Sequence, residues 1–200
     1  MRARFLASAT AAVLVLLPVP AHAHLVTTGL GPFYDGVSHF FVSPDDLVPV
    51  LAMALLAGLN GPRAGRYALF VLSLAWLVGG LLGGRWPGTP AAPIATSLSF
   101  LVLGGLVALD RRLPFAVVVA LAAALGLRHG FGNGAALASS PGGPQGLVGI
   151  AIAIFVVFAL VSAFVVSLRA PWTRIAVRVA GSWIAAIGLL LLGWGLRGSS

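Results

Sequence analysis

Six apolar runs occupy most of this 200-residue chain, and only short links separate them. A membrane-spanning helix needs about 20 apolar residues. The links contain Gly, Pro or Arg, and none is long enough to form a separate domain. We therefore predict an all-α fold, with residues 24–200 forming one bundle of six transmembrane helices. The predicted spans are a first helix that opens at Ser43 and continues through 47–60, then Tyr67–Gly83, Ala91–Leu109, Pro114–Ala138, Gly146–Leu168 and Ile175–Leu196.

The composition requires a lipid environment. Hydrophobic residues make up 60% of the chain and charged residues only 8%, whereas a soluble domain carries roughly 25% charged residues. The basic residues are scattered between the apolar runs, a pattern that sets membrane topology and does not indicate nucleic-acid binding. The chain has no cysteine, so a bound metal ion would need imidazole, carboxylate, amide or hydroxyl ligands.

Residues 1–23 resemble a secretory signal peptide, with Arg2 and Arg4 before an apolar core and small residues before position 24. Cleavage would leave His24 at the mature amino terminus, where its α-amine and imidazole could chelate a metal ion. An uncleaved signal anchor is the alternative. The Gly-containing segment Leu25–Ser38 is predicted to be a loop outside the membrane.

The distribution of arginine indicates the orientation of the chain. A cleaved signal peptide places the mature amino terminus outside, so the first, third and fifth links would face the cytoplasm. Those links and their margins contain seven arginines, and the outer side has two. This asymmetry follows the positive-inside rule. It predicts a multi-pass protein of a bacterial-type inner membrane. The seven are Arg63, Arg66, Arg111, Arg112, Arg169, Arg174 and Arg178, and the two are Arg85 and Arg197.

The fourth apolar run contains unusual polar residues. His129 and Asn133 are four residues apart and share one helix face, and Arg128 is next to His129. Ionisable side chains inside a membrane usually face a cavity or a partner. Three glycines at intervals of four, Gly126, Gly130 and Gly134, form a ridge on which a second helix could pack closely. The alternative is a packing helix whose polar side chains only bond neighbouring loops.

Topology places several other polar residues at the same depth as His129, in the outer part of the membrane. Asp45 and Asp46 open the first span, where they could cap the helix or form a site. An arginine at this depth needs a partner, so we predict that Arg128 pairs with one of these two acids. The residues expected in this layer are His39, Asp45, Asp46, Thr96, Ser97, Arg128, His129 and Asn133.

These features together resemble the HupE/UreJ family of small membrane proteins, which is associated with uptake of nickel or a related divalent metal. The resemblance rests on the span count, on AHAH at the signal end, and on two motifs. The first motif, His-x5-Asp-His, corresponds here to His39, Asp45 and Asp46. The second, Phe-His-Gly-x-Ala-His-Gly-x-Glu, begins at Arg128 and retains His129, whereas Asn133 replaces its second histidine.

The resemblance implies a secondary permease or facilitator that carries a divalent transition metal ion as substrate and has no resident cofactor. His39, Asp45, Asp46, His129 and Asn133 are the predicted ligands, with His24, Thr96, Ser97 and Arg128 in supporting positions. One alternative is a non-transporting membrane subunit. It would bind a second copy of itself, as a homo-oligomer, or another membrane protein through its glycine ridges. The chain is not predicted to be an enzyme, since no recognisable nucleophile motif accompanies Ser97 or Ser99. An intramembrane hydrolase using one of these serines with His129 is the remaining alternative.

Overall fold

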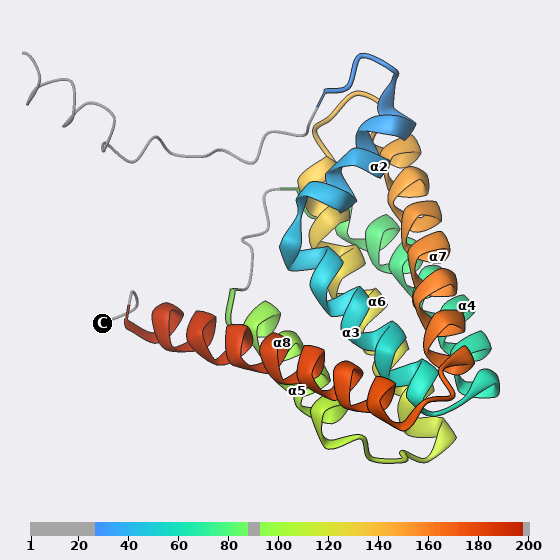
Figure 1. Cartoon of the computed structure of the whole chain (residues 1–200). Coiled ribbons are helices and arrows are strands. Elements are labelled where there is room, and N and C mark those ends of the chain that lie inside the picture. Colours follow the sequence, from blue (N-terminus) through green and yellow to red (C-terminus); the bar gives the residue numbers. More distant parts are fainter. Residues whose placement is uncertain (1–26, 88–92, 198–200) are drawn as a thin grey trace, which may run out of the picture.

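The computed structural model describes residues 27–87 and 93–197, and every regular element within these ranges is a helix (Figure 1). The all-α prediction is therefore confirmed for the described part of the chain. The predicted signal peptide and His24 lie outside the described residues. The helices are α2 (Pro32–Val42), α3 (Pro44–Leu59), α4 (Pro62–Gly83), α5 (Pro93–Leu109), α6 (Phe115–Leu137), α7 (Gly143–Ser167) and α8 (Pro171–Arg197).

Four of these helices, α4, α6, α7 and α8, are long and apolar enough to cross a membrane. A fifth candidate span is the pair α2 and α3, which meet at an angle of 74°. Helix α5 has 17 residues and rises only about 26 Å, less than the ~30 Å hydrocarbon core. The structure thus supports four or five spans by length and composition, and the predicted sixth stays a prediction.

Helix α2 begins at Pro32, so the prediction of a loop over Leu25–Ser38 is wrong for the second half of that segment. Two glycines, one in α2 and one in α7, allow close packing of these helices. A side chain at Gly36 would collide with the backbone of Gly146 in α7, and one at Gly149 would collide with Phe33. Glycine therefore brings α2 and α7 into contact here.

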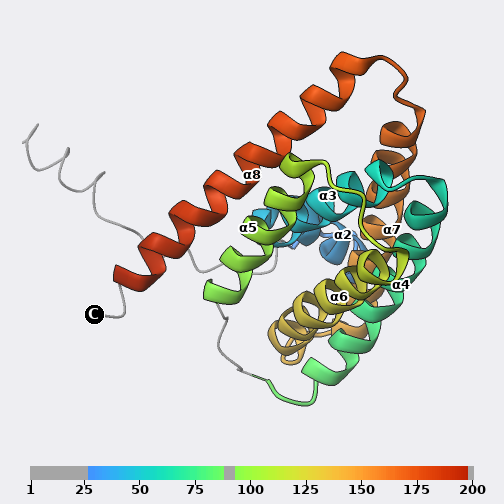
Figure 2. The same ribbon diagram turned by 90° about the horizontal axis from the view of Figure 1, so that it is seen from below.

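The helices form two groups. Helices α4, α6 and α7 pack together, and α2 and α3 lie against α7. Helices α5 and α8 form a separate pair that contacts the larger group mainly through α3. Figure 2 shows this pair on one side of the molecule and α4, α6 and α7 on the other. As a result, α5 and α6 are not closely packed on each other.

The glycine ridge of α6 faces α4. Side chains added at Gly126, Gly130 and Gly134 would collide with the backbone of Leu72, Trp76 and Gly80, respectively. The ridge thus allows direct backbone contact between the two helices, the arrangement that small residues permit in membranes.

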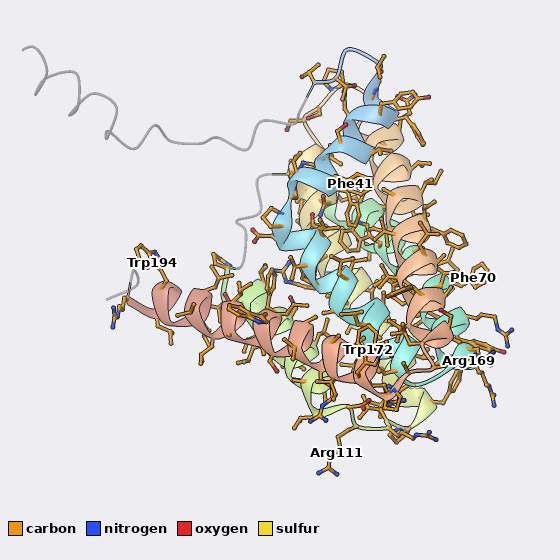
Figure 3. The ribbon with its side chains drawn as sticks, in the orientation of Figure 1. Phe41, Phe70, Arg111, Arg169, Trp172 and Trp194 are labelled. Carbon is orange, nitrogen blue, oxygen red and sulfur yellow. The ribbon has the colours of Figure 1, made fainter. Side chains whose placement is uncertain are left out.

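The arginine-rich links gather at one end of the molecule, where α3, α5 and α7 end (Figure 1). Figure 3 shows the side chains of Arg111 and Arg169 at this end. Two contacts join the links to one another: Asn60 accepts a hydrogen bond of 2.8 Å from the amide of Leu113, and the guanidinium of Arg174 binds both carboxylate oxygens of Asp110 at 3.1 and 2.6 Å. The first, third and fifth links therefore share one side.

Candidate functional site

The buried polar cluster joins the middle of α6 to the first turn of α3. His129 and Asn133 lie on the buried face of α6, because their spacing of four places them one helical turn apart. Asp46 is buried at the start of α3, and its Oδ1 lies 2.9 Å from Nδ1 of His129. The amide Nδ2 of Asn133 donates to Oδ2 of Asp46 at 2.8 Å and to the backbone carbonyl of His129 at 3.0 Å. Both oxygens of one carboxylate are thus occupied by α6.

The Asp46 contact determines which imidazole nitrogen is available. An ionised carboxylate only accepts hydrogen bonds, so Nδ1 of His129 carries the hydrogen that points to Asp46. In a neutral imidazole, Nε2 is then the acceptor, and it lies 3.3 Å from the hydroxyl Oγ of Ser99 in α5. The ring of Trp76 in α4 stacks on the imidazole with a centroid distance of 5.7 Å. The imidazole therefore has a fixed orientation.

Within the described residues, three buried side-chain atoms have no hydrogen-bond partner: Oδ1 of Asn133, Nε1 of Trp76 and Oγ of Ser73. The Asn133 oxygen is beside the Asp46 contact and is free to accept. Ser73 and Trp76 were not predicted as site residues. Their spacing of three on α4, with a hydroxyl inside an apolar run, is the signal that could have indicated a shared inward face.

The other predicted ligands are not gathered around His129. Across residues 27–87 and 93–197, no three His, Cys, Asp or Glu side chains are close enough to hold a metal ion together. His39 lies near the end of α2, with its Nε2 3.5 Å from Oγ of Ser43. Asp45 is exposed, although Asp46 beside it is buried. The predicted layer thus contributes Asp46, His129 and Asn133 to one cluster and leaves His39 and Asp45 outside it.

The polar residues of α5 differ in what they contact. The hydroxyl of Ser97 donates to the carbonyl of Pro93 at 2.8 Å, which places it in the backbone bonding of its own helix. Ser99 lies next to His129 and its hydroxyl also lies 2.7 Å from the carbonyl of Thr96. Of the predicted supporting residues on this helix, Thr96 contacts Ser99 through its backbone carbonyl, and Ser97 bonds its own helix.

Arg128 was predicted to pair with Asp45 or Asp46, but the ion pairs among the described residues do not join it to either acid. The carboxylate of Asp46 is bonded to His129 and Asn133, because these two donors lie on the face of α6 that meets α3. Arg128 is one position further round the helix and half-buried. It borders a cavity between α5 and α6.

This cavity has a volume of about 270 Å³, and its walls are almost entirely apolar. Ser99 and His129 are polar groups in its lining, and Arg128 adds a positive charge to the lining. Several of the lining side chains are exposed on the outer surface, so the cavity opens sideways between the helices. Its apolar lining consists of Leu98, Val102, Leu103, Leu121, Ala124 and Leu125.

The apolar helices and the buried carboxylate–imidazole–amide cluster define a multi-pass helical membrane protein with a polar site inside its helix bundle. The chain belongs to the HupE/UreJ family: the model described as HupE / UreJ protein matches residues 12–191. It is similar to Protein HupE of Rhizobium leguminosarum bv. viciae, with 27% identity over 177 residues that cover 88% of this chain and 92% of that protein. No solved structure matches the chain significantly.

Proposed function

We propose that this protein is a secondary permease or facilitator for a divalent transition metal ion, nickel-like in its ligand preference. The observation that carries the proposal is the buried contact of 2.9 Å between Asp46 and His129 in a chain of the HupE/UreJ family. Ionisable side chains inside membrane proteins commonly mark the path of a substrate or ion. Imidazole and carboxylate are also suitable ligands for such metals.

The proposed ligands are better suited to transport of the metal ion than to its permanent binding. Asp46, His129 and the unpartnered Oδ1 of Asn133 supply one carboxylate, one imidazole and one amide oxygen. Such a mixed set has fewer imidazoles than the family motif and would bind nickel more weakly. A transport site must bind an ion strongly enough to capture it and weakly enough to release it. The weaker cluster meets this requirement.

We further propose that the ion enters from the outer side and leaves toward the arginine-rich end, as the positive-inside rule orients the chain. On entry, the ion would compete with His129 and Asn133 for the carboxylate of Asp46. His39 and Asp45 lie nearer the start of this path on α2 and α3 and would contact the ion before it reaches the cluster.

The test is accumulation of radioactive nickel in cells that express the protein. His129→Ala and Asp46→Ala should each reduce uptake at least tenfold at equal protein levels, because each removes a proposed ligand. Asp110→Asn is the matched control: it removes an acid that pairs with Arg174 at the opposite end, and uptake should be unchanged. Uptake that survives loss of His129 would instead favour the accessory subunit.

A further inference from the structure

The contacts of His129 also suit a chemical role that does not depend on a metal ion. Asp46 lies 2.9 Å from Nδ1 of the imidazole, and Ser99 lies 3.3 Å from Nε2. Carboxylate, imidazole and hydroxyl are thus arranged in the order used by serine hydrolases, in which the imidazole is the general base. The three side chains come from three helices, α3, α6 and α5, and sequence proximity does not bring them together.

We propose that Ser99, His129 and Asp46 form a hydrolytic triad that cleaves a carboxylic ester carrying an apolar acyl chain, drawn sideways from the membrane. The cavity beside Ser99 supports this choice of substrate. It is lined by apolar side chains from α5 and α6 and opens between them. Its volume of about 270 Å³ is close to the lower limit of roughly 300–1,000 Å³ for ligand pockets. It therefore suits the acyl portion of an ester, with the remainder in the bilayer.

The imidazole of His129 is oriented to act as a general base. With its Nδ1 hydrogen directed at Asp46, His129 presents the acceptor nitrogen Nε2 to Ser99. Ser99 has one hydroxyl hydrogen, which it can donate to Nε2 or to the carbonyl of Thr96 2.7 Å away. Rotation of the hydrogen toward Nε2 gives the reactive state. Such contacts are often long before substrate binds.

The reaction begins when Oγ of Ser99 attacks the ester carbonyl carbon and its proton moves to Nε2 of His129. Arg128 belongs to the cavity lining, and its positive charge would favour the negative charge that develops on the carbonyl oxygen. The ester carbon–oxygen bond then breaks, and the leaving alkoxide takes the proton from Nε2. Water attacks the acyl-serine, gives one proton to Nε2, and releases the carboxylic acid as that proton returns to Ser99. The net reaction consumes one ester and one water and yields one acid and one alcohol.

The test is covalent labelling of the purified full-length protein in lipid nanodiscs by a fluorophosphonate probe, with the modified residue located by mass spectrometry. We expect labelling of Ser99 in the wild type. Ser99→Ala should abolish labelling, and His129→Gln should slow it at least ~100-fold, the lower range for loss of a general base. Ser167→Ala is the matched control, because Ser167 makes the same hydroxyl-to-carbonyl contact of 2.7 Å on α7 without an imidazole nearby. It should label as the wild type does.

Asp46 acts through the imidazole and is a positioning residue. Asp46→Asn should fold normally, because its amide can donate to Nδ1 of His129 once the ring hydrogen moves to Nε2. That change blocks the base, so labelling should fall by at least 100-fold. Asp46→Glu, which restores the carboxylate, should recover part of the rate. Equal labelling in the Asn and Glu variants would overturn the assigned role of Asp46.

Ester hydrolysis tests separately whether the cavity between α5 and α6 binds the acyl chain. The ratio of p-nitrophenyl octanoate hydrolysis to p-nitrophenyl acetate hydrolysis should decrease at least tenfold in Ala124→Trp, which fills the cavity. Ala136→Trp, on an exposed position of the same helix away from the cavity, should leave this ratio unchanged. Labelling and hydrolysis should also be insensitive to EDTA. The proposal is wrong if folded wild-type protein is not labelled, if Ser99→Ala is still labelled, or if EDTA stops the reaction, and none of these results bears on nickel uptake.

Discussion

At the scale of single residues, the carboxylate of Asp46 organises the site. Its two oxygens accept from His129 and Asn133, at 2.9 and 2.8 Å, and these bonds fix the first turn of α3 against α6. Asp45, its neighbour in sequence, is exposed at the same helix start. The two acids can therefore be separated experimentally, although the sequence presents them as equivalent.

Asp46→Leu should lower the free energy of unfolding by about 1–3 kcal/mol, because the Nδ1 hydrogen of His129 would be left buried without an acceptor. Asp45→Leu should change it by at most about 0.5 kcal/mol, as expected for an exposed position. Denaturant titration of both variants in the same detergent is the measurement. Equal losses would contradict the buried role of Asp46.

Asn133 is the second residue whose chemistry can be tested directly. Asn133→His restores the imidazole that the family motif has at this position, and imidazole is a better nickel ligand than an amide oxygen. The nickel concentration that half-saturates uptake should fall by about tenfold, which corresponds to about 1.4 kcal/mol of binding free energy. Asn133→Gln, which keeps the amide, should not reproduce this decrease.

At the scale of elements, the contact between α4 and α6 is the closest packing next to the site. Backbone atoms of Trp76 occupy the space that a side chain at Gly130 would need. By contrast, a side chain at Gly132 would meet only the end of Arg128, at 3.6 Å. One helix thus offers a tight glycine and an exposed glycine two residues apart.

Gly130→Leu should therefore lower the melting temperature of the purified protein strongly, because overpacking typically costs about 1–3 kcal/mol and rigid backbone offers little relief. Gly132→Leu adds the same side chain on the exposed face and should melt within a few degrees of the wild type. A small, equal shift for both would mean that α6 does not pack on α4 through this ridge.

The sequence predicted the helices better than it predicted the connections between them. The spacing of His129 and Asn133 correctly indicates a shared helix face, since a period of 3.6 residues depends only on local backbone geometry. Helix α2 was missed because glycine is read locally as a loop signal, whereas Gly36 is needed for contact with α7. The helical period places Ser97 and Ser99 on different faces of α5. Which of the two meets His129 could not be predicted, because it depends on how α5 is rotated against α6.

At the scale of the whole molecule, the arginine-rich links lie together at one end, which is consistent with the predicted orientation. The natural absence of cysteine makes this orientation testable. Arg111→Cys should resist an impermeant maleimide in intact cells and react after the membrane is opened. Ser139→Cys, in the link between α6 and α7 at the opposite end, should react in intact cells. The reverse pattern would invert the proposed direction of entry.

In the proposed function, this chain alone carries a divalent metal ion past the Asp46–His129 contact. Purified protein in liposomes that enclose a nickel-sensitive dye tests it most directly, since no cellular partner is present. We expect quenching of the dye on external addition of nickel, loss of quenching in His129→Ala, and normal quenching in Asp110→Asn. Wild-type liposomes that exclude nickel as protein-free liposomes do, or equal quenching in His129→Ala and the wild type, would contradict it.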